Sequence, residues 1–237
     1  MDKKSEFLWP SGPEYICREG VFPLSTDSVL LSDFAAIPRR GTVADLGCGS
    51  GILLLLALWG QEGIKGYGLD MDPAAIENTA CNLRQNGLSD RAELFCGDIR
   101  NIPALLPPRS CDLVLANPPY FPAGSMGESA ARKETDISLA ELCAGAGWIL
   151  RDGGRFCAVY RPERMAELMA AMEGARLTPK RLRFVQDRVE KSPSLLLIEG
   201  RKQAKPGLRV EPVLLLREAD GSESREYRRI YKREGTK

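Results

Sequence analysis

Short apolar segments alternate with longer amphipathic segments along most of the chain after residue 41. Short apolar runs are typical of buried strands, and apolar residues at helical spacing are typical of helices packed on one side. The pattern predicts strands at Thr42–Leu46, Gly66–Leu69, Ala92–Phe95, Cys111–Ala116 and Arg155–Tyr160. It predicts helices at Ser25–Ala36, Ile52–Trp59, Pro73–Gln85, Ser138–Ile149 and Pro162–Glu173.

Strands that alternate with helices in this way form right-handed βαβ units. We therefore expect an α/β fold with a mostly parallel sheet and helices on both faces. Two further strands, Arg181–Gln186 and Ser194–Gly200, would form an antiparallel hairpin at the sheet edge and bring the sheet to seven strands. We expect three regions: an N-terminal segment (1–40), the main domain (41–201) and a C-terminal tail (202–237) with one short strand at Val213–Leu216.

Composition excludes several classes of protein. A content of 43% hydrophobic and 27% charged residues is ordinary for a folded globular chain. The longest apolar run, Ile52–Trp59, is far shorter than the roughly 20 residues of a membrane span. The N-terminus has no apolar segment behind its lysines, so we expect no signal peptide and a cytoplasmic location. Nothing in the sequence indicates the oligomeric state, and a monomer is the default expectation.

Histidine is absent from the chain, which excludes histidine-based catalysis. None of the seven cysteines forms a C-x-x-C pair, so we expect no metal site and interpret the cysteines as small apolar residues.

The net charge of +1 hides an uneven distribution of charge. Residues 1–150 hold 12 basic and 19 acidic residues, a net charge of −7, whereas residues 151–237 hold 21 and 13, a net charge of +8. A basic C-terminal third indicates either a polyanionic partner such as nucleic acid or merely a solvated charged surface.

A glycine-rich segment, Asp45-Leu46-Gly47-Cys48-Gly49-Ser50-Gly51, connects the first predicted βα strand to its helix. Glycines at this place allow a tight turn and close approach of a ligand. The G-x-G-x-G spacing differs from the G-x-G-x-x-G of dinucleotide sites, and no G-K-[ST] follows. Asp45 would repel a pyrophosphate, so the segment favours a cationic cofactor.

Two more acids lie where strands end. Asp70 ends the second strand, where a carboxylate can bind both ribose hydroxyls, and Asp98 follows the third, where it could accept a hydrogen bond from an adenine amino group. Each acid alone is also typical of a helix cap or a turn.

The segment Asn117-Pro118-Pro119-Tyr120-Phe121 follows the fourth strand, beside the glycine-rich segment. An exocyclic amine on an aromatic ring is a poor nucleophile because its lone pair is delocalised. The Asn117 side-chain oxygen and the Pro118 carbonyl could accept the two amine hydrogens and turn the lone pair toward a methyl donor. Tyr120 and Phe121 could stack on the base. An isolated Asn-Pro is typically only a turn.

Together these motifs resemble class I S-adenosylmethionine-dependent methyltransferases with an N-P-P-Y motif, over about residues 42–160. The resemblance implies a Rossmann-like fold and S-adenosylmethionine as cofactor. It also implies the site residues. The glycine-rich segment would lie under the methionine moiety, Asp70 would hold the ribose, Asp98 would read the adenine and Met71 would pack on its face. The cofactor-binding residues are then Asp45, Gly47, Gly49, Gly51, Asp70, Met71, Asp98 and Asn117, and the catalytic residues are Asn117, Pro118 and Tyr120.

N-P-P-Y enzymes methylate adenine in DNA or RNA, guanine in ribosomal RNA, or glutamine in release factors, so the motif alone leaves the substrate open. Residues 20–32, Arg132-Lys133-Glu134 and residues 199–210 resemble the tRNA1(Val) (adenine-37-N(6))-methyltransferase family. This resemblance implies transfer to the exocyclic nitrogen of an anticodon-loop adenosine in tRNA. Phe121, Arg132, Arg201 and Lys202 would then bind the RNA.

Four alternatives stay open, of which the first two are glutamine of a release factor and guanine of ribosomal RNA as substrates. With 44 residues before Asp45 and 237 in total, we expect neither the helical domain usual in release-factor enzymes nor the duplicated domain common in guanine enzymes. DNA adenine remains an alternative substrate, and a catalytically idle RNA-binding module is the alternative of another class.

Overall fold

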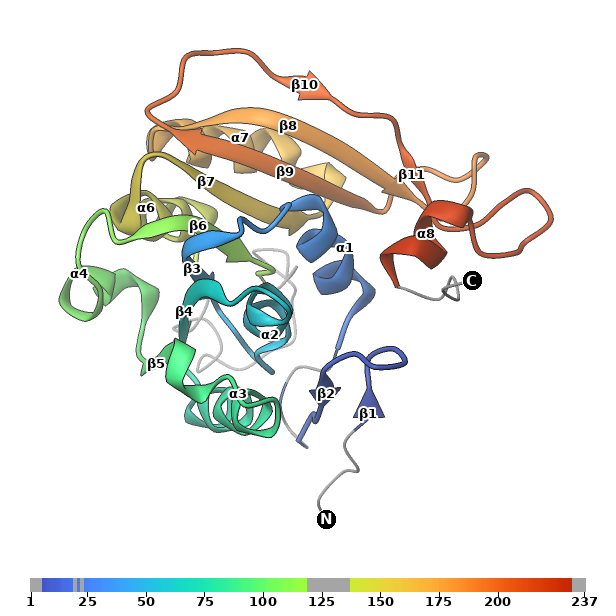
Figure 1. The fold of residues 1–237 in the computed structure, drawn as a ribbon. Coiled ribbons are helices and arrows are strands. Elements are labelled where there is room, and N and C mark those ends of the chain that lie inside the picture. Colours follow the sequence, from blue (N-terminus) through green and yellow to red (C-terminus); the bar gives the residue numbers. More distant parts are fainter. Residues whose placement is uncertain (1–5, 19–20, 22–23, 119–136, 232–237) are drawn as a thin grey trace, which may run out of the picture.

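The computed structural model describes residues 6–18, 21, 24–118 and 137–231, which form one nine-stranded sheet with helices on both faces (Figure 1). Along the sheet the strands follow the order β10-β8-β9-β7-β6-β3-β4-β5, and β11 also pairs with β8. Their bounds are β3 (Arg40–Leu46), β4 (Gly63–Asp70), β5 (Ala92–Cys96), β6 (Cys111–Ala116), β7 (Leu150–Tyr160), β8 (Leu177–Gln186), β9 (Leu195–Lys202), β10 (Arg209–Val210) and β11 (Leu214–Leu215).

The five strands from β3 to β7 are parallel to one another, and only β9 runs antiparallel to its neighbours β7 and β8. The carboxyl ends of β3 to β7 therefore lie along one edge, which we call the carboxyl edge, and their amino ends along the opposite amino edge. This mostly parallel α/β fold is confirmed.

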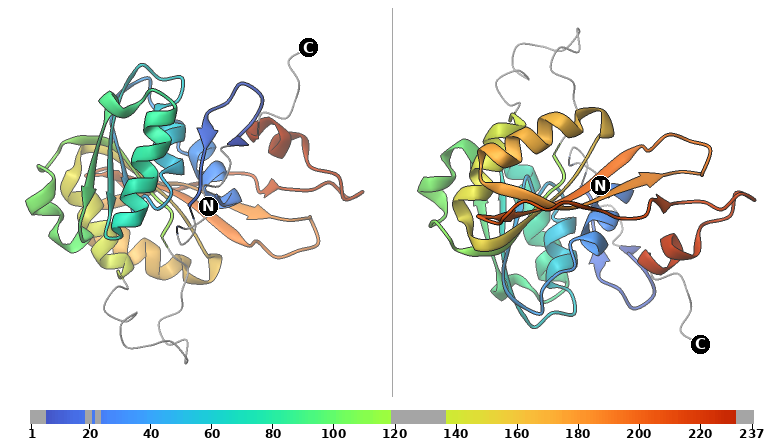
Figure 2. Two further views of the ribbon diagram at one scale, coloured as in Figure 1. Left: turned by 90° about the horizontal axis from the view of Figure 1, so that it is seen from below. Right: turned by 90° about the horizontal axis from the view of Figure 1, so that it is seen from above.

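Helices cover the two faces of the sheet (Figure 2). Two apolar cores fill the space between the helices and the sheet. The first core holds residues of α1 (Thr26–Phe34), α2 (Ile52–Leu58) and α3 (Pro73–Gln85), and the second holds residues of α4 (Ile102–Leu105), α6 (Leu139–Ile149) and α7 (Met165–Gly174). Alternate residues of a strand point to opposite faces, so Val43 of β3 joins the first core and its neighbour Ala44 the second. Strands buried on both faces explain the continuous apolar runs in the sequence.

The C-terminal segment is more closely joined to the domain than the sequence indicates. The predicted β8–β9 hairpin is present, but it does not form the sheet edge, because β10 and β11 both pair in parallel with β8. The helix α8 (Arg225–Ile230) buries Ile230 in the first core, and Arg229 lies 3.2 Å from the carboxylate of Asp33 on α1. The expectation of seven strands was wrong because two-residue strands such as β10 leave no periodic signal.

The N-terminal segment also differs from the prediction. Two short strands, β1 (Glu6–Phe7) and β2 (Glu14–Tyr15), form a separate sheet that the sequence does not predict. The predicted helix at Ser25–Ala36 is present as α1, with Ser25 as its N-cap. All seven cysteines are unpaired; four of them are buried, whereas Cys17 and Cys81 are half-buried and Cys96 is exposed. Within the described residues, no helix has the length and apolar character needed to cross a membrane.

Candidate active site

The glycine-rich segment forms a turn between the carboxyl end of β3 and the start of α2. The amide groups of Gly47 and Cys48 both donate to the Leu69 carbonyl on β4, at 2.8 and 3.0 Å, which holds the turn against the neighbouring strand. Gly51 has a φ of 80°, and a Cβ there would lie 2.7 Å from the Thr79 side chain on α3. Gly47, with a φ of 75°, has no atom within 4 Å of the position of a Cβ. The turn thus requires glycine and leaves space above Gly47 for a ligand.

Asp45 lies directly before this turn and is almost completely buried, with 1% of its surface exposed. Neither carboxylate oxygen has a hydrogen-bond partner among the described residues. Burial raises the pKa of this carboxyl to about 7, and the negative charge of Asp70 adds to the increase. A buried acid without a partner is costly, and a cationic ligand would relieve that cost. The donor set therefore fits a cofactor that carries positive charge.

Asp70 ends β4 and is bonded to the turn from the adjacent strand. Its Oδ2 accepts a hydrogen bond of 2.8 Å from the Gly49 amide, and its Oδ1 accepts one of 3.0 Å from the Asp72 amide. The structure thus brings Asp70 together with the glycine-rich turn, as the sequence predicts. Met71, the next residue, exposes 39% of its surface at this edge.

Asp98 follows β5 and caps the 3-10 turn Ile99–Asn101. The Arg100 guanidinium donates from Nε to both carboxylate oxygens, at 3.0 and 2.8 Å, and this contact lowers the pKa of Asp98. The carboxylate is therefore ionised and already bound to a cation. The sequence pattern does not indicate a role for Arg100. The role of Asp98 as a reader of adenine stays a prediction.

Asn117 follows β6 at the carboxyl edge. Leu115 of β6 pairs with Asp45 of β3, so Asn117 lies beside the glycine-rich turn. Its side-chain nitrogen donates to Ser28 Oγ at 2.9 Å and to Ser25 Oγ at 3.3 Å, both at the start of α1. A planar carboxamide holds its oxygen on the side opposite its nitrogen, so the Asn117 oxygen faces away from these hydroxyls. The two serines were missed by sequence reasoning.

Of the remaining predicted residues, the structure describes Pro118, Arg201 and Lys202. Tyr120, Phe121 and Arg132 lie outside the described residues. Pro118 is described and half-buried. Arg201 and Lys202, at the end of β9, lie at the amino edge: Arg201 pairs with Arg155 of β7, whereas Ala158 of β7 pairs with Ala116 beside Asn117.

Arg201 and Lys202 already have partners at the amino edge. Lys202 donates to the Leu150 carbonyl at 2.7 Å, and Arg201 lies 3.7 Å from Glu199. Their contact with RNA stays a prediction.

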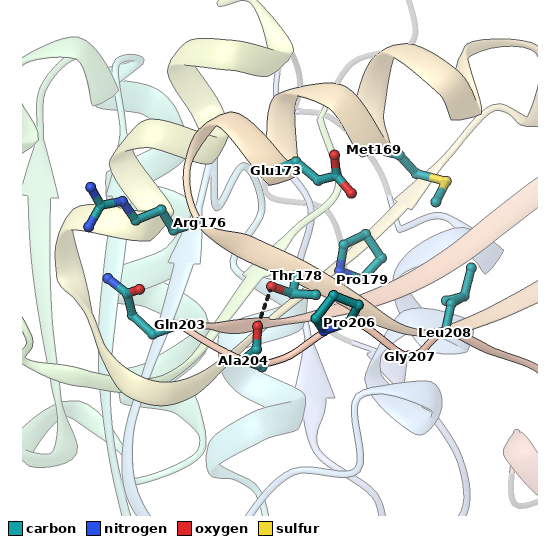
Figure 3. A pocket seen from close by; sticks show the side chains of 10 residues that line it. All are labelled: Met169, Glu173, Arg176, Thr178, Pro179, Gln203, Ala204, Pro206, Gly207 and Leu208. Carbon is teal, nitrogen blue, oxygen red and sulfur yellow. Dashed lines mark hydrogen bonds between the residues drawn. The ribbon is translucent and has the colours of Figure 1, made fainter.

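A pocket of about 450 Å³ lies near these residues at the amino edge (Figure 3). It is lined by the start of β8, the loop after β9 and the end of α7, with Arg176, Thr178 and Gln203 among its polar side chains. The Thr178 hydroxyl donates to the Ala204 carbonyl at 2.9 Å across its base. It is separate from the turn at the carboxyl edge.

Comparison with known proteins agrees with the site at the carboxyl edge. The sequence model of the methyltransferase small domain family matches residues 20–178. This range includes the glycine-rich turn, the three acids Asp45, Asp70 and Asp98, and Asn117. The chain belongs to this methyltransferase family. It is an S-adenosylmethionine-dependent methyltransferase, which confirms the predicted enzyme class and cofactor.

Curated relatives share moderate identity with the methyltransferase over most of its length. A tRNA1(Val) (adenine(37)-N6)-methyltransferase of Porphyromonas gingivalis is 29% identical over 220 residues, covering 87% of this chain and 86% of its own. A protein of the same name from Yersinia pestis is also 29% identical, with 86% and 83% covered. One from Shewanella loihica is 34% identical over a shorter region, 56% of this chain and 57% of its own.

Solved structures show the same fold. A predicted O-methyltransferase from Agrobacterium tumefaciens aligns with a TM-score of 0.73 at 20% identity, over 87% of this chain and 96% of its own. TrmN from Thermus thermophilus aligns with a TM-score of 0.55 at 22% identity, over 74% of this chain and 48% of its own. These likenesses confirm the Rossmann-like fold of the methyltransferase.

Proposed function

We propose that the methyltransferase transfers a methyl group to the exocyclic N6 of an adenine in RNA, with an anticodon-loop adenosine of tRNA, position 37, as substrate. The observation that carries the proposal is the place of Asn117-Pro118 at the carboxyl edge, directly beside the glycine-rich turn. The names of the curated relatives from Porphyromonas gingivalis and Yersinia pestis support the choice of RNA adenine.

The cofactor would lie along the carboxyl ends of β3, β4 and β5. S-adenosylmethionine supplies an electrophilic methyl group on a positively charged sulfonium. Gly47, Gly49 and Gly51 provide the turn over which the methionine moiety fits, and Asp45 provides the buried negative charge that favours a cation there. Asp70 would bind the ribose hydroxyls, Met71 would pack on the adenine, and Asp98 would accept from its amino group.

Asn117 and Pro118 would bind the target amine. The Asn117 side-chain oxygen and the Pro118 carbonyl each accept one N–H of the adenine amino group, which turns the nitrogen lone pair out of conjugation with the ring. No strong base is required before attack, because the amine nitrogen becomes acidic once it carries the additional methyl group. The absence of histidine is compatible with this chemistry.

The remaining substrate contacts extend the proposal to the RNA. Tyr120 and Phe121 would stack on the flipped base, and Arg132 would contact a nearby phosphate. Contact with Arg201 and Lys202 would require the RNA to reach the amino edge as well. A tRNA substrate favours action in the cytoplasm, and a monomer is sufficient for the proposed chemistry.

The test is methyl transfer from labelled S-adenosylmethionine to a panel of substrates: tRNA lacking its own modification, ribosomal RNA, DNA and a release factor. Nucleoside digestion of the labelled RNA identifies the methylated base. We expect N6-methyladenosine in tRNA and no label in the other substrates. Label in the release factor or in ribosomal guanine, with unmodified tRNA left unlabelled, would overturn the tRNA proposal while leaving the methyltransferase class intact.

A further inference from the structure

Two hydroxyl groups at the start of α1 hold the side chain of Asn117. Ser28 Oγ accepts from the Asn117 side-chain nitrogen at 2.9 Å, and Ser25 Oγ accepts from the same nitrogen at 3.3 Å. The two hydroxyls lie 3.4 Å apart. A carboxamide nitrogen carries two hydrogens, so the pair of hydroxyls can bind both. These contacts join residues 89 and 92 positions apart in the chain.

In the structure, the carboxamide turns its nitrogen toward the two serines and its oxygen away from them. Turned by 180°, Asn117 would present its oxygen to the two serines and its NH₂ group to the site. That orientation places a donor where the target amine also offers donors. The observed orientation places an acceptor there, which is the group that an amine substrate needs. The hydroxyls thus hold the carboxamide with its acceptor oxygen turned away from α1.

Ser28 is buried, with 4% of its surface exposed, so its hydroxyl is shielded from bulk solvent. Ser25 also caps α1, because its hydroxyl accepts from the Ser28 amide at 3.4 Å. Removal of the Ser25 hydroxyl therefore affects the helix as well as Asn117, whereas Ser28 Oγ has the shorter contact with Asn117. Ser28 is accordingly the better residue to test.

The carboxyl end of α1, the helix that begins at the two serines, is bound to two arginines of the sheet. The carbonyls of Phe34 and Ala35 accept from Arg181 and Arg155, at 3.3 and 2.6 Å. Both arginines pair with Glu199, at 2.9 and 3.3 Å, whose side chain is 3% exposed. These contacts anchor the carboxyl end of α1 to a buried charge cluster.

We infer that Ser28, assisted by Ser25, is a positioning residue for catalysis: its hydroxyl orients the Asn117 carboxamide so that the oxygen accepts from the target amine. The inference rests on the proposed adenine N6 transfer for its kinetic readout. It requires no chemistry from Ser28 itself, because the hydroxyl only accepts a hydrogen bond from Asn117.

The experiment compares four variants: Ser28→Ala, Ser28→Thr, Ser28→Val and the control Ser32→Ala. Threonine and valine have nearly the same shape, so both variants add the same volume. The difference in kcat between them therefore measures the effect of the hydroxyl. Ser32 lies one turn further along α1 and is not in the contact with Asn117. Each variant is assayed for kcat and KM with unmodified tRNA, for S-adenosylmethionine affinity by calorimetry and for thermal stability.

We expect kcat to fall about tenfold to a hundredfold in Ser28→Ala, and in Ser28→Val relative to Ser28→Thr. S-adenosylmethionine affinity and the KM for tRNA should change less than about twofold, and Ser32→Ala should match the wild type. Equal kcat values for the valine and threonine variants would overturn the inference. A loss of kcat that only follows the loss of thermal stability across the variants would also overturn the inference.

A readout independent of activity separates this inference from the proposed function. The side-chain NH₂ resonances of Asn117 are assigned in a nitrogen-15 spectrum by their absence in Asn117→Ala. They should shift in Ser28→Ala and Ser28→Val and stay near the wild-type position in Ser28→Thr. Unchanged resonances in all three would overturn the inference. Inactivity of the wild type on tRNA, with the expected shifts present, would overturn the substrate proposal instead.

Discussion

The amide of Gly49 donates to the carboxylate of Asp70 at 2.8 Å, which joins the glycine-rich turn after β3 to the end of β4. The same carboxylate accepts from the Asp72 amide through its other oxygen. One side chain thus fixes the turn, begins the connection to α3 and would bind the ribose. Cofactor affinity and the shape of the turn should therefore depend on the same carboxylate.

Substitution of Asp70 tests this dependence. Asp70→Ala removes the acceptor of Gly49 and the proposed ribose ligand, so S-adenosylmethionine affinity should fall about tenfold to a hundredfold. Asp70→Asn keeps an acceptor oxygen, so its S-adenosylmethionine affinity should fall less than that of Asp70→Ala. Isothermal titration calorimetry measures both, with the exposed Asp90→Asn as the matched control. Wild-type affinity in Asp70→Ala would contradict the assigned role.

The raised pKa of Asp45, about 7, predicts an unusual dependence of stability on pH. Between about pH 4 and pH 7 the folded chain keeps a proton on Asp45 that the unfolded chain has released. Stability from this group is therefore complete at low pH and falls as pH rises toward 7, by up to about 1.4 kcal/mol per pH unit. Urea unfolding of the wild type and Asp45→Asn should show this decline in the wild type only. Parallel curves of unfolding free energy against pH for the two proteins would contradict this expectation.

Cofactor affinity should change with pH in the opposite direction. A cationic ligand favours the ionised form of Asp45, so S-adenosylmethionine should bind the wild type about tenfold more tightly at pH 8 than at pH 6, relative to Asp45→Asn. The negative charge of Asp70 is also present in the variant, and burial raises the pKa of Cys48 well above its ordinary value, so neither group produces this difference. If the ratio of wild-type affinity to variant affinity were the same at pH 6 and pH 8, Asp45 would not respond to the cofactor.

An asparagine row on α3 should be important for stability. Asn82 is completely buried, accepts from the Ile16 amide at 2.8 Å, and donates to the Ile16 and Ser50 carbonyls, both at 2.9 Å. Asn82→Ala leaves these three backbone groups without that partner, so the free energy of unfolding should fall by about 2–4 kcal/mol. Because Ser50 lies in the glycine-rich turn, cofactor affinity should fall too. Urea unfolding measures the loss, and Asn101→Ala, at an exposed position, should be close to wild type.

The buried acid Glu199 should be equally important. It lies between Arg155 and Arg181, and its side chain is 3% exposed. Glu199→Ala leaves two partly buried guanidinium groups without their shared partner, so we expect a loss of about 3–5 kcal/mol in the free energy of unfolding. Glu173→Ala, an exposed acid on α7, is the control and should change stability by less than about 0.5 kcal/mol. A loss of similar size in both variants would contradict the role of the cluster.

Residues that follow a clear local pattern of strands and helices could be predicted from the sequence. Residues whose role depends on contacts between distant parts of the chain could not. The glycine-rich segment, Asp70 and Asn117 were found because each follows a strand whose apolar pattern is clear. Ser28 could not be found, because its partner Asn117 is 89 positions away. The asparagines 78, 82 and 86 do leave a signal, a polar row at helical spacing on α3, and their backbone partners lie in the N-terminal segment and the glycine-rich turn.

The charged residues near the C-terminus show a different limit. Their number indicates a basic region, but the strand register decides which edge they occupy. The antiparallel direction of β9 places Arg201 and Lys202 at the edge opposite Asn117, and Arg183 is bound to Glu226 at 2.8 Å. Composition alone contains no information on strand direction.

The most direct test of the central claim uses unmodified tRNA, labelled S-adenosylmethionine, the wild type and Asn117→Ala. After transfer, the RNA is digested to nucleosides and the labelled product is identified. At saturating S-adenosylmethionine, we predict N6-methyladenosine with the wild type and at least about a hundredfold less with Asn117→Ala. Equal amounts of N6-methyladenosine from both proteins would contradict the assignment of Asn117 as the residue that binds the amine.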